Sequence, residues 1–306
     1  MAKDAIQRIG QEALDRALGK VLHGRHFGHA FGFFGPDAAA VKAQATWFTN
    51  VLACAKQSLE PCGDCEACKS IARADGVVLM HVEPEADQRS ISVERIRALR
   101  QDVALLAGAL PRIIFIPQAD RLAGAAANAL LKLLEEPGAK TFFVLTAPNA
   151  KSVLPTIRSR TAWYAVQAIA AEQAAQALCN AGYAKPLAMQ ALRFVPGQAQ
   201  LAAQLCAAPE QLATLEATER ALLHILAQPL PQRFQSMQQL LGKKTESTVE
   251  TSRVFAMLNQ LLYLIRQQPG LWPTIPSIGR AFLRLRTNAQ PRLILEAIFA
   301  ALPQTV

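Results

Sequence analysis

Four cysteines lie close together in the first quarter of the chain. They are Cys54, Cys62, Cys65 and Cys68, in the segment CAKQSLEPCGDCEACK. Four thiolates at this spacing can surround one Zn²⁺ tetrahedrally, at about 2.3 Å each. The pattern offers no catalytic acid or histidine and no open ligand position, so we expect a structural zinc that fixes an excursion between a helix and the next strand. A redox C-x-x-C pair and unrelated free thiols are the alternatives.

A second segment, residues 31–54, opens like a phosphate-binding strand, loop and helix. A working loop follows G-x-x-x-x-G-K-[ST], in which backbone N–H groups and the lysine hold the phosphates. Gly35 matches the first glycine, but Ala40, Val41 and Lys42 occupy the positions of the second glycine, the lysine and the hydroxyl. Valine supplies no charge, and Lys42 lies about 100° around a helix from the required direction. We therefore expect no functional ATP binding; an ordinary strand–turn–helix is the alternative.

The acidic half of an ATPase site is missing as well. In such enzymes a strand ends in adjacent acidic residues that hold magnesium and orient water. The candidate strand is RIIFI, residues 112–116, and it is followed by Pro117 and Gln118, with Asp120 two residues further on, expected on the next turn. Both halves of the hydrolytic apparatus are absent together, which favours an inactive ATPase fold and no intrinsic ATPase activity.

Arginines in LPTIRSRT, residues 154–161, follow another apolar run. A plain surface loop would explain them. Alternatively, an arginine presented here could reach a neighbouring protein's phosphate and stabilise transition-state charge in trans. Just upstream, AAANALLKLLEEPG at 125–138 predicts a helix, and packing of its leucine stripe against a core explains the periodicity fully.

Short apolar runs alternate with helical sequence over roughly residues 1–168, and this alternation predicts a parallel sheet covered by helices. The expected strands are 31–34, 77–82, 113–116, 142–146 and 163–166, and the expected helices are 2–19, 41–54, 93–106 and 125–136.

Beyond residue 168 the chain is expected to be all helical. Short helices punctuated by glycine and proline predict a small helical domain at 169–209. Longer helical segments predict a second, larger α-helical domain at 210–306, whose last helix would begin with Asn288 as a cap. The sequence thus divides into an α/β domain at 1–168 and two helical domains.

Composition narrows the protein class. The chain has 306 residues and a formal net charge of +9, which favours a polyanionic partner such as DNA, although a solvated basic surface would also explain it. The sequence contains no run of about 20 uncharged apolar residues, so no membrane span is expected. The N-terminus carries charges throughout and lacks the apolar core of a signal peptide, so a cytoplasmic protein is expected.

Taken together, these segments resemble the clamp-loader AAA+ family of bacterial DNA polymerase III. The resemblance covers essentially the whole chain and is firmest over residues 9–161. It rests on IGQEALDRAL, HAFGFFGP, the four-cysteine segment, ISVERIRAL, AAANALLKLLEEP, LPTIRSR and NAQPRLILEA. The resemblance implies an AAA+ domain with a RecA-like parallel sheet and a zinc-binding insert, followed by a helical lid domain and an all-α collar domain.

The resemblance also implies roles for individual residues. The four cysteines match the family's zinc ligands. Ser159 and Arg160 match the start of a Ser-Arg-Cys motif, whose arginine reaches into the ATP site of the adjacent subunit, and Thr161 replaces the motif's cysteine. A further phosphate-sensing arginine is expected three residues after a glycine, but Gln200 follows Gly197 there.

The expected function is that of a non-hydrolysing subunit, which lends Arg160 to a neighbouring motor ATPase while the loader places the sliding clamp on primed DNA. The implied partners are motor and delta-type subunits, and through them the clamp and primer-template DNA. Two alternatives stay open: an active motor-type ATPase, and a stand-alone zinc-containing DNA-binding protein.

Overall fold

The computed structural model of the chain describes residues 10–24, 28–85, 88, 90–105, 110–122, 124–241, 247–285 and 290–303. It divides into two compact units, Met1–Gln204 and Leu205–Val306, which are described separately below. Among the described residues, no helix is both long and apolar enough to cross a membrane.

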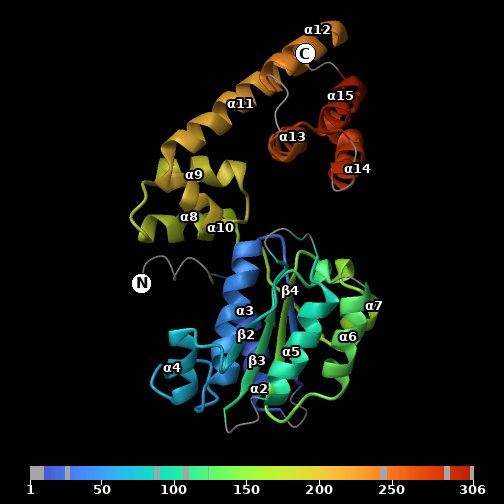
Figure 1. The fold of residues 1–306 in the computed structure, drawn as a ribbon. Helices are drawn as coiled ribbons and strands as arrows, with labels where there is room; N and C mark the ends of the chain where they lie inside the picture. The colour runs from blue at the N-terminus through green and yellow to red at the C-terminus, as the bar shows by residue number, and fades with distance from the viewer. Residues whose placement is uncertain are drawn as a thin grey trace. The chain divides into compact units, whose positions relative to one another are not determined.

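The first unit is built on a five-stranded sheet (Figure 1). All strand pairs are parallel, and the strand order is β2-β3-β4-β1-β5, which confirms the predicted parallel α/β fold. The strands are β1 Ala30–Phe34, β2 Leu79–His81, β3 Arg112–Ile116, β4 Thr141–Ala147 and β5 Ala162–Ala165.

Helices cover both faces of this sheet (Figure 1). Because side chains alternate along a strand, Ile113 and Phe115 of β3 join one apolar cluster while Ile114 and Ile116 join the other. The first cluster contains the buried residues of α2 and α3, and the second those of α5, α6 and α7. These helices are α2 Glu12–Leu22, α3 Ala38–Ala53, α5 Val93–Leu105, α6 Gly124–Glu135 and α7 Pro155–Arg158.

Several elements of this unit differ from the sequence-based expectation. The helix predicted at 2–19 is described only from residue 10, and α2 continues to Leu22; residues 2–9 lie outside the described residues. A helix that was not predicted, α4 Glu66–Arg73, begins inside the cysteine segment, and one turn of helix, α7, occupies part of LPTIRSRT. Three helices follow the sheet: α8 Ala171–Asn180, α9 Lys185–Phe194 and α10 Ala199–Ala207, the last of which contains the boundary between the two units.

The described part of the second unit is helical, as its sequence predicted. Its core contains buried leucines and isoleucines from all of its α-helices. The elements are α11 Pro209–Ala227, α12 Leu230–Leu241, α13 Ser247–Gln267, η3 Pro269–Thr274, α14 Ile275–Leu285 and α15 Pro291–Ala301. The sequence did not single out α12, η3 and α14, and the cap expected at Asn288 lies outside the described residues.

A buried arginine joins three segments of this helical unit. Arg233 on α12 is only 2% exposed. Its Nε donates to the carbonyl of Gln228 at 2.8 Å and its Nη2 to the carbonyl of Leu226 at 2.9 Å. Its Nη1 donates to the carbonyls of Phe299 and Leu302, at 3.3 and 2.6 Å. These acceptors lie at the C-terminal ends of α11 and α15, where helices leave carbonyls unsatisfied and favour a cation.

Candidate functional site

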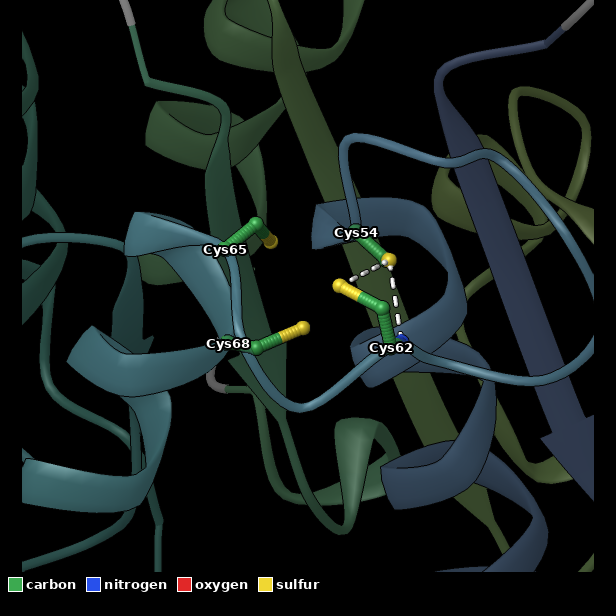
Figure 2. A group of neighbouring side chains, drawn as sticks. All are labelled: Cys54, Cys62, Cys65 and Cys68. Atoms are coloured by element: carbon green, nitrogen blue, oxygen red, sulfur yellow. Dashed lines mark hydrogen bonds between the residues drawn. The ribbon is translucent and has the colours of Figure 1, made fainter.

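The four predicted cysteines meet at one place. Cys54 is the residue that ends α3, Cys62 lies in the following loop, Cys65 precedes α4, and Cys68 lies in its first turn. Their four Sγ atoms all lie within 4.8 Å of one another (Figure 2). A tetrahedral zinc with bonds of about 2.3 Å separates its sulfurs by about 3.8 Å, so the cluster could hold a metal ion after small adjustments of the side chains.

Backbone groups favour the thiolate form of Cys65, whereas burial disfavours that of Cys68. The N–H of Cys62 points at Cys54 Sγ at 3.3 Å, and the two sulfurs lie 3.5 Å apart. The N–H groups of Ala55 and Cys68 lower the pKa of Cys65 to about 6, because they stabilise its negative form. Burial raises the pKa of Cys68 to about 12, since the metal-free thiolate would be poorly solvated. All-sulfur ligation suits a soft or borderline metal such as zinc.

The loop after β1 does not have the shape of a phosphate cradle. Gly35 is not among the described glycines with a positive φ angle. A Cβ at this position would lie 2.4 Å from the carbonyl oxygen of Val166, so Gly35 allows the end of β1 to pack closely against the chain after β5. The side chain of Val41 is buried in the core at 3% exposure, whereas Lys42 faces solvent. Position 41 therefore supplies no positive charge to the loop, and the lysine at position 42 is exposed to solvent.

Sequence reasoning missed the residue that occupies the N-terminus of α3. Asp37 is 5% exposed, and its Oδ1 accepts hydrogen bonds from the N–H groups of Ala39 and Ala40, at 2.9 and 3.2 Å. These are the donors that a phosphate would use at a helix N-terminus. Asp37 thus fills that position with a carboxylate of the chain itself. An aspartate directly before an alanine-rich helix is a recognised N-cap signal and could have identified it.

The residues after β3 lack the arrangement of an acidic magnesium site. Gln118 adopts a left-handed conformation with φ of 57°, and its N–H donates to Oγ1 of Thr146 at the end of β4. Asp120 lies in the short turn η1 Ala119–Arg121, as expected. Its Oδ1 is buried and has no hydrogen-bond partner among the described residues.

Arg160 lies in the turn between α7 and β5, with its side chain 38% exposed. The carboxylate of Glu135, the last residue of α6, contacts it at two nitrogens: Oε1 lies 2.9 Å from Nε and 2.6 Å from Nη2. Nη1 donates to the carbonyl of Thr156 at 3.1 Å and contacts Ser159 Oγ at 3.4 Å. The guanidinium is thus accessible and fixed by neighbouring groups.

The threonine that replaces the motif cysteine fits its position. Thr161 is 7% exposed, and its hydroxyl donates to the carbonyl of Ile157 at 3.0 Å. A buried hydroxyl with a partner carries no unsatisfied polar group. The substitution is therefore compatible with the turn that carries Arg160.

The sheet separates Arg160 from the loop after β1. Strands β1 and β5 are parallel neighbours, with Phe31 paired to Ala162 and Phe34 paired to Ala165. Arg160 precedes the start of β5, whereas Gly35 follows the end of β1. Gly35 is level with residue 166, six residues beyond Arg160, so at about 3.3 Å per residue the two positions lie at opposite ends of the strands, roughly 20 Å apart. Arg160 therefore cannot serve the loop of its own chain.

Comparison with known proteins matches slightly more than half of the chain to one protein family. A family model described as DNA polymerase III, delta subunit, matches residues 10–170, which contain the sheet, the cysteine cluster and Arg160.

Two curated relatives each match about half of the chain. DNA polymerase III subunit gamma/tau of Mycobacterium tuberculosis (strain ATCC 25618 / H37Rv) is 35% identical over 160 residues, which cover 51% of this chain and 27% of the relative. DNA polymerase III subunit delta' of Yersinia pestis is 33% identical over 162 residues, which cover 52% of this chain and 44% of the relative. The chain thus spans less than half the length of these relatives.

Among solved structures, a DNA polymerase III gamma subunit-related protein from Thermotoga maritima is similar over 94% of this chain and 97% of its own. The sequence identity is 17% and the TM-score is 0.45.

Proposed function

The chain belongs to the DNA polymerase III delta subunit family, in its delta-prime form, and from this membership we propose that it is a clamp-loader subunit that lends Arg160 to a neighbouring ATPase. In this proposal the chain does not bind or hydrolyse ATP itself. It assists the motor subunits, related to gamma/tau, during placement of a sliding clamp on primed DNA.

The loop after β1 supports the first part of this proposal. Three features act against phosphate binding: the carboxylate of Asp37 on the helix N-terminus, the buried apolar side chain of Val41, and the solvent-facing direction of Lys42. A carboxylate at this position repels an incoming phosphate and already uses two of the N–H donors. Pro117 and Gln118 remove the acidic residues that would hold magnesium after β3.

The position of Arg160 is the observation that carries the proposal. The guanidinium is accessible at the N-terminal ends of the parallel strands, while the loop after β1 lies at their C-terminal ends. An arginine supplied from another chain stabilises transition-state charge in other nucleotide hydrolases, where it is worth 10³–10⁵ in rate. A residue placed away from its own loop suits that role in trans.

We propose that the cysteine cluster holds a structural zinc. It would join the end of α3 to the start of α4 through Cys54 and Cys68, with Cys62 and Cys65 completing the closed set. A four-cysteine site without an open position holds no substrate, so its contribution is to the folding of residues 54–73.

We further propose the domain roles that the resemblance implies. Residues 1–168 would be the AAA+ α/β domain and 169–209 the helical lid. Residues 210–306 would be the collar, which packs against other subunits. The partners would be motor and delta-type subunits, and through them the sliding clamp and primer-template DNA, in the cytoplasm.

A motor-type ATPase is the second candidate, because the gamma/tau relative is 35% identical to the matched segment. Purified chain would then turn over ATP on its own. We expect no turnover above background, since the helix N-terminus is capped by Asp37 and position 41 lies in the core.

The proposed function is tested in a reconstituted loader. We expect Arg160→Ala to lower DNA-stimulated ATP turnover of the complex by about an order of magnitude, below the full effect of a single-site hydrolase because several sites share the work. The matched control is Arg158→Ala, at the last residue of α7 and two positions before Arg160. Unchanged turnover with Arg160→Ala, in a complex that still assembles, would refute the role in trans.

A further inference from the structure

We propose that Glu135 is the positioning residue of Arg160, holding the guanidinium ready for a phosphate of the neighbouring subunit. This inference rests on the proposed function and extends it to a residue on a different element. The pair links the last residue of α6 to the turn after α7, 25 positions along the chain.

The contact geometry is specific to the guanidinium. A single carboxylate oxygen, Glu135 Oε1, lies 2.9 Å from Nε and 2.6 Å from Nη2. It therefore contacts the Nε–Nη2 side of the guanidinium. On the other side, Nη1 is held by the carbonyl of Thr156 and approached by the hydroxyl of Ser159. The guanidinium plane is therefore fixed by three groups from α6, α7 and the turn.

The location of Glu135 argues against a role in helix stability. The C-terminal end of a helix carries partial negative charge and favours a cation, so a carboxylate at the last residue of α6 is unfavourably placed. Both side chains are also half-exposed, at 38% for Arg160 and 49% for Glu135, and exposed ion pairs contribute little to folding. What the pair does supply is a defined direction for the arginine.

Such a direction matters for catalysis in trans. A free arginine side chain would have to lose rotamer freedom each time it met a phosphate, which slows the reaction it assists. Nη2 has no acceptor other than Glu135 among the described residues, and the exposed part of the guanidinium is open to an anion. The carboxylate would thus preset the arginine while leaving access for the neighbour's phosphate.

A double-mutant cycle in the reconstituted loader tests this role. We expect Glu135→Ala to lower kcat of DNA-stimulated ATP turnover about three- to fivefold, with KM for ATP changed less than twofold. In the Arg160→Ala background, the same substitution should cause no further loss, because the two residues act as one unit. Glu135→Gln, which keeps one acceptor, should lie between wild type and Glu135→Ala. The matched control is Glu136→Ala, since Glu136 makes no ion pair with any residue that the structure describes.

Chemical modification of the isolated chain gives a readout that does not depend on activity. Phenylglyoxal attacks accessible guanidinium groups, and the ion pair with Glu135 should protect Arg160. We expect Glu135→Ala to accelerate modification of Arg160 at least threefold by mass spectrometry, with Arg158 as the internal reference and Glu136→Ala as the control.

Three results would overturn the inference while leaving the proposed function intact. They are unchanged or increased turnover with Glu135→Ala, an equal loss in the Arg160→Ala background, and an unchanged modification rate of Arg160. If Arg160→Ala itself had no effect, the proposed function would fail, and the positioning role with it.

Discussion

Replacing Arg233 by methionine should destabilise the second unit strongly. Arg233 donates to the carbonyls of four residues, Leu226, Gln228, Phe299 and Leu302, and is 2% exposed. Methionine fills a similar volume but donates no hydrogen bond. The carbonyls belong to the backbone and cannot be removed with the arginine, so they would remain buried without partners.

The size of the effect follows from these four contacts. A hydrogen bond to a charged group contributes about 1.5–3 kcal/mol, which gives roughly 6–12 kcal/mol for the set. Burying the guanidinium costs several kcal/mol, as the lowered pKa of Arg233 on desolvation reflects. The difference leaves a loss of about 3–5 kcal/mol, consistent with about 1–3 kcal/mol for each buried acceptor left without a partner. A domain of this size has only about 5–15 kcal/mol in total.

The assay is urea unfolding of the full chain, combined with hydrogen exchange followed by mass spectrometry. Peptides from α12 and α15 should lose protection at lower urea in Arg233→Met, while peptides from β3 and β4 should keep the wild-type behaviour. Arg220→Met is the matched control, because Arg220 is exposed on α11. A loss below about 1 kcal/mol for Arg233→Met, or equal effects of both variants, would refute the argument.

Two further predictions concern the first unit. Purified chain should contain one zinc ion by elemental analysis. Cys62→Ser or a chelator should remove the zinc and increase hydrogen exchange in residues 54–73, while the sheet stays protected. A chain purified without zinc would contradict the metal assignment. Restoring the second glycine and the lysine of the phosphate-loop pattern with Ala40→Gly and Val41→Lys should not create ATP binding, measured with a fluorescent analogue. The double substitution should also lower the free energy of unfolding by about 3 kcal/mol or more, because position 41 is buried. Tight nucleotide binding by this variant would show that the Asp37 cap does not block the loop.

Local sequence patterns predicted the parts of the molecule that depend on near neighbours. Apolar runs separated by helical sequence identified the parallel sheet, and the spacing of Cys54 to Cys68 identified a cluster that the structure brings together. The cap at Asp37 depends on equally local sequence, an aspartate directly before an alanine-rich helix. These features need only a few consecutive residues to be recognised.

Tertiary contacts account for what the sequence did not reveal. The pairing of Glu135 with Arg160 spans 25 positions, and no periodicity in either segment marks it. Arg233 lies on an amphipathic helix, where an arginine is usually solvated, and only the meeting of α11, α12 and α15 buries it. Strand order is non-local in the same way, since β4 lies between β3 and β1 only through crossovers.

The separation of Arg160 from the Gly35 loop gives the first unit a polarity. If chains with this architecture stack head to tail, each donates an arginine from one side and accepts one on the other. If this chain donates Arg160 without binding nucleotide, as proposed, it would complete a site on one neighbour and offer none to the other. An assembly that contains it would therefore be asymmetric, with fewer working nucleotide sites than subunit interfaces.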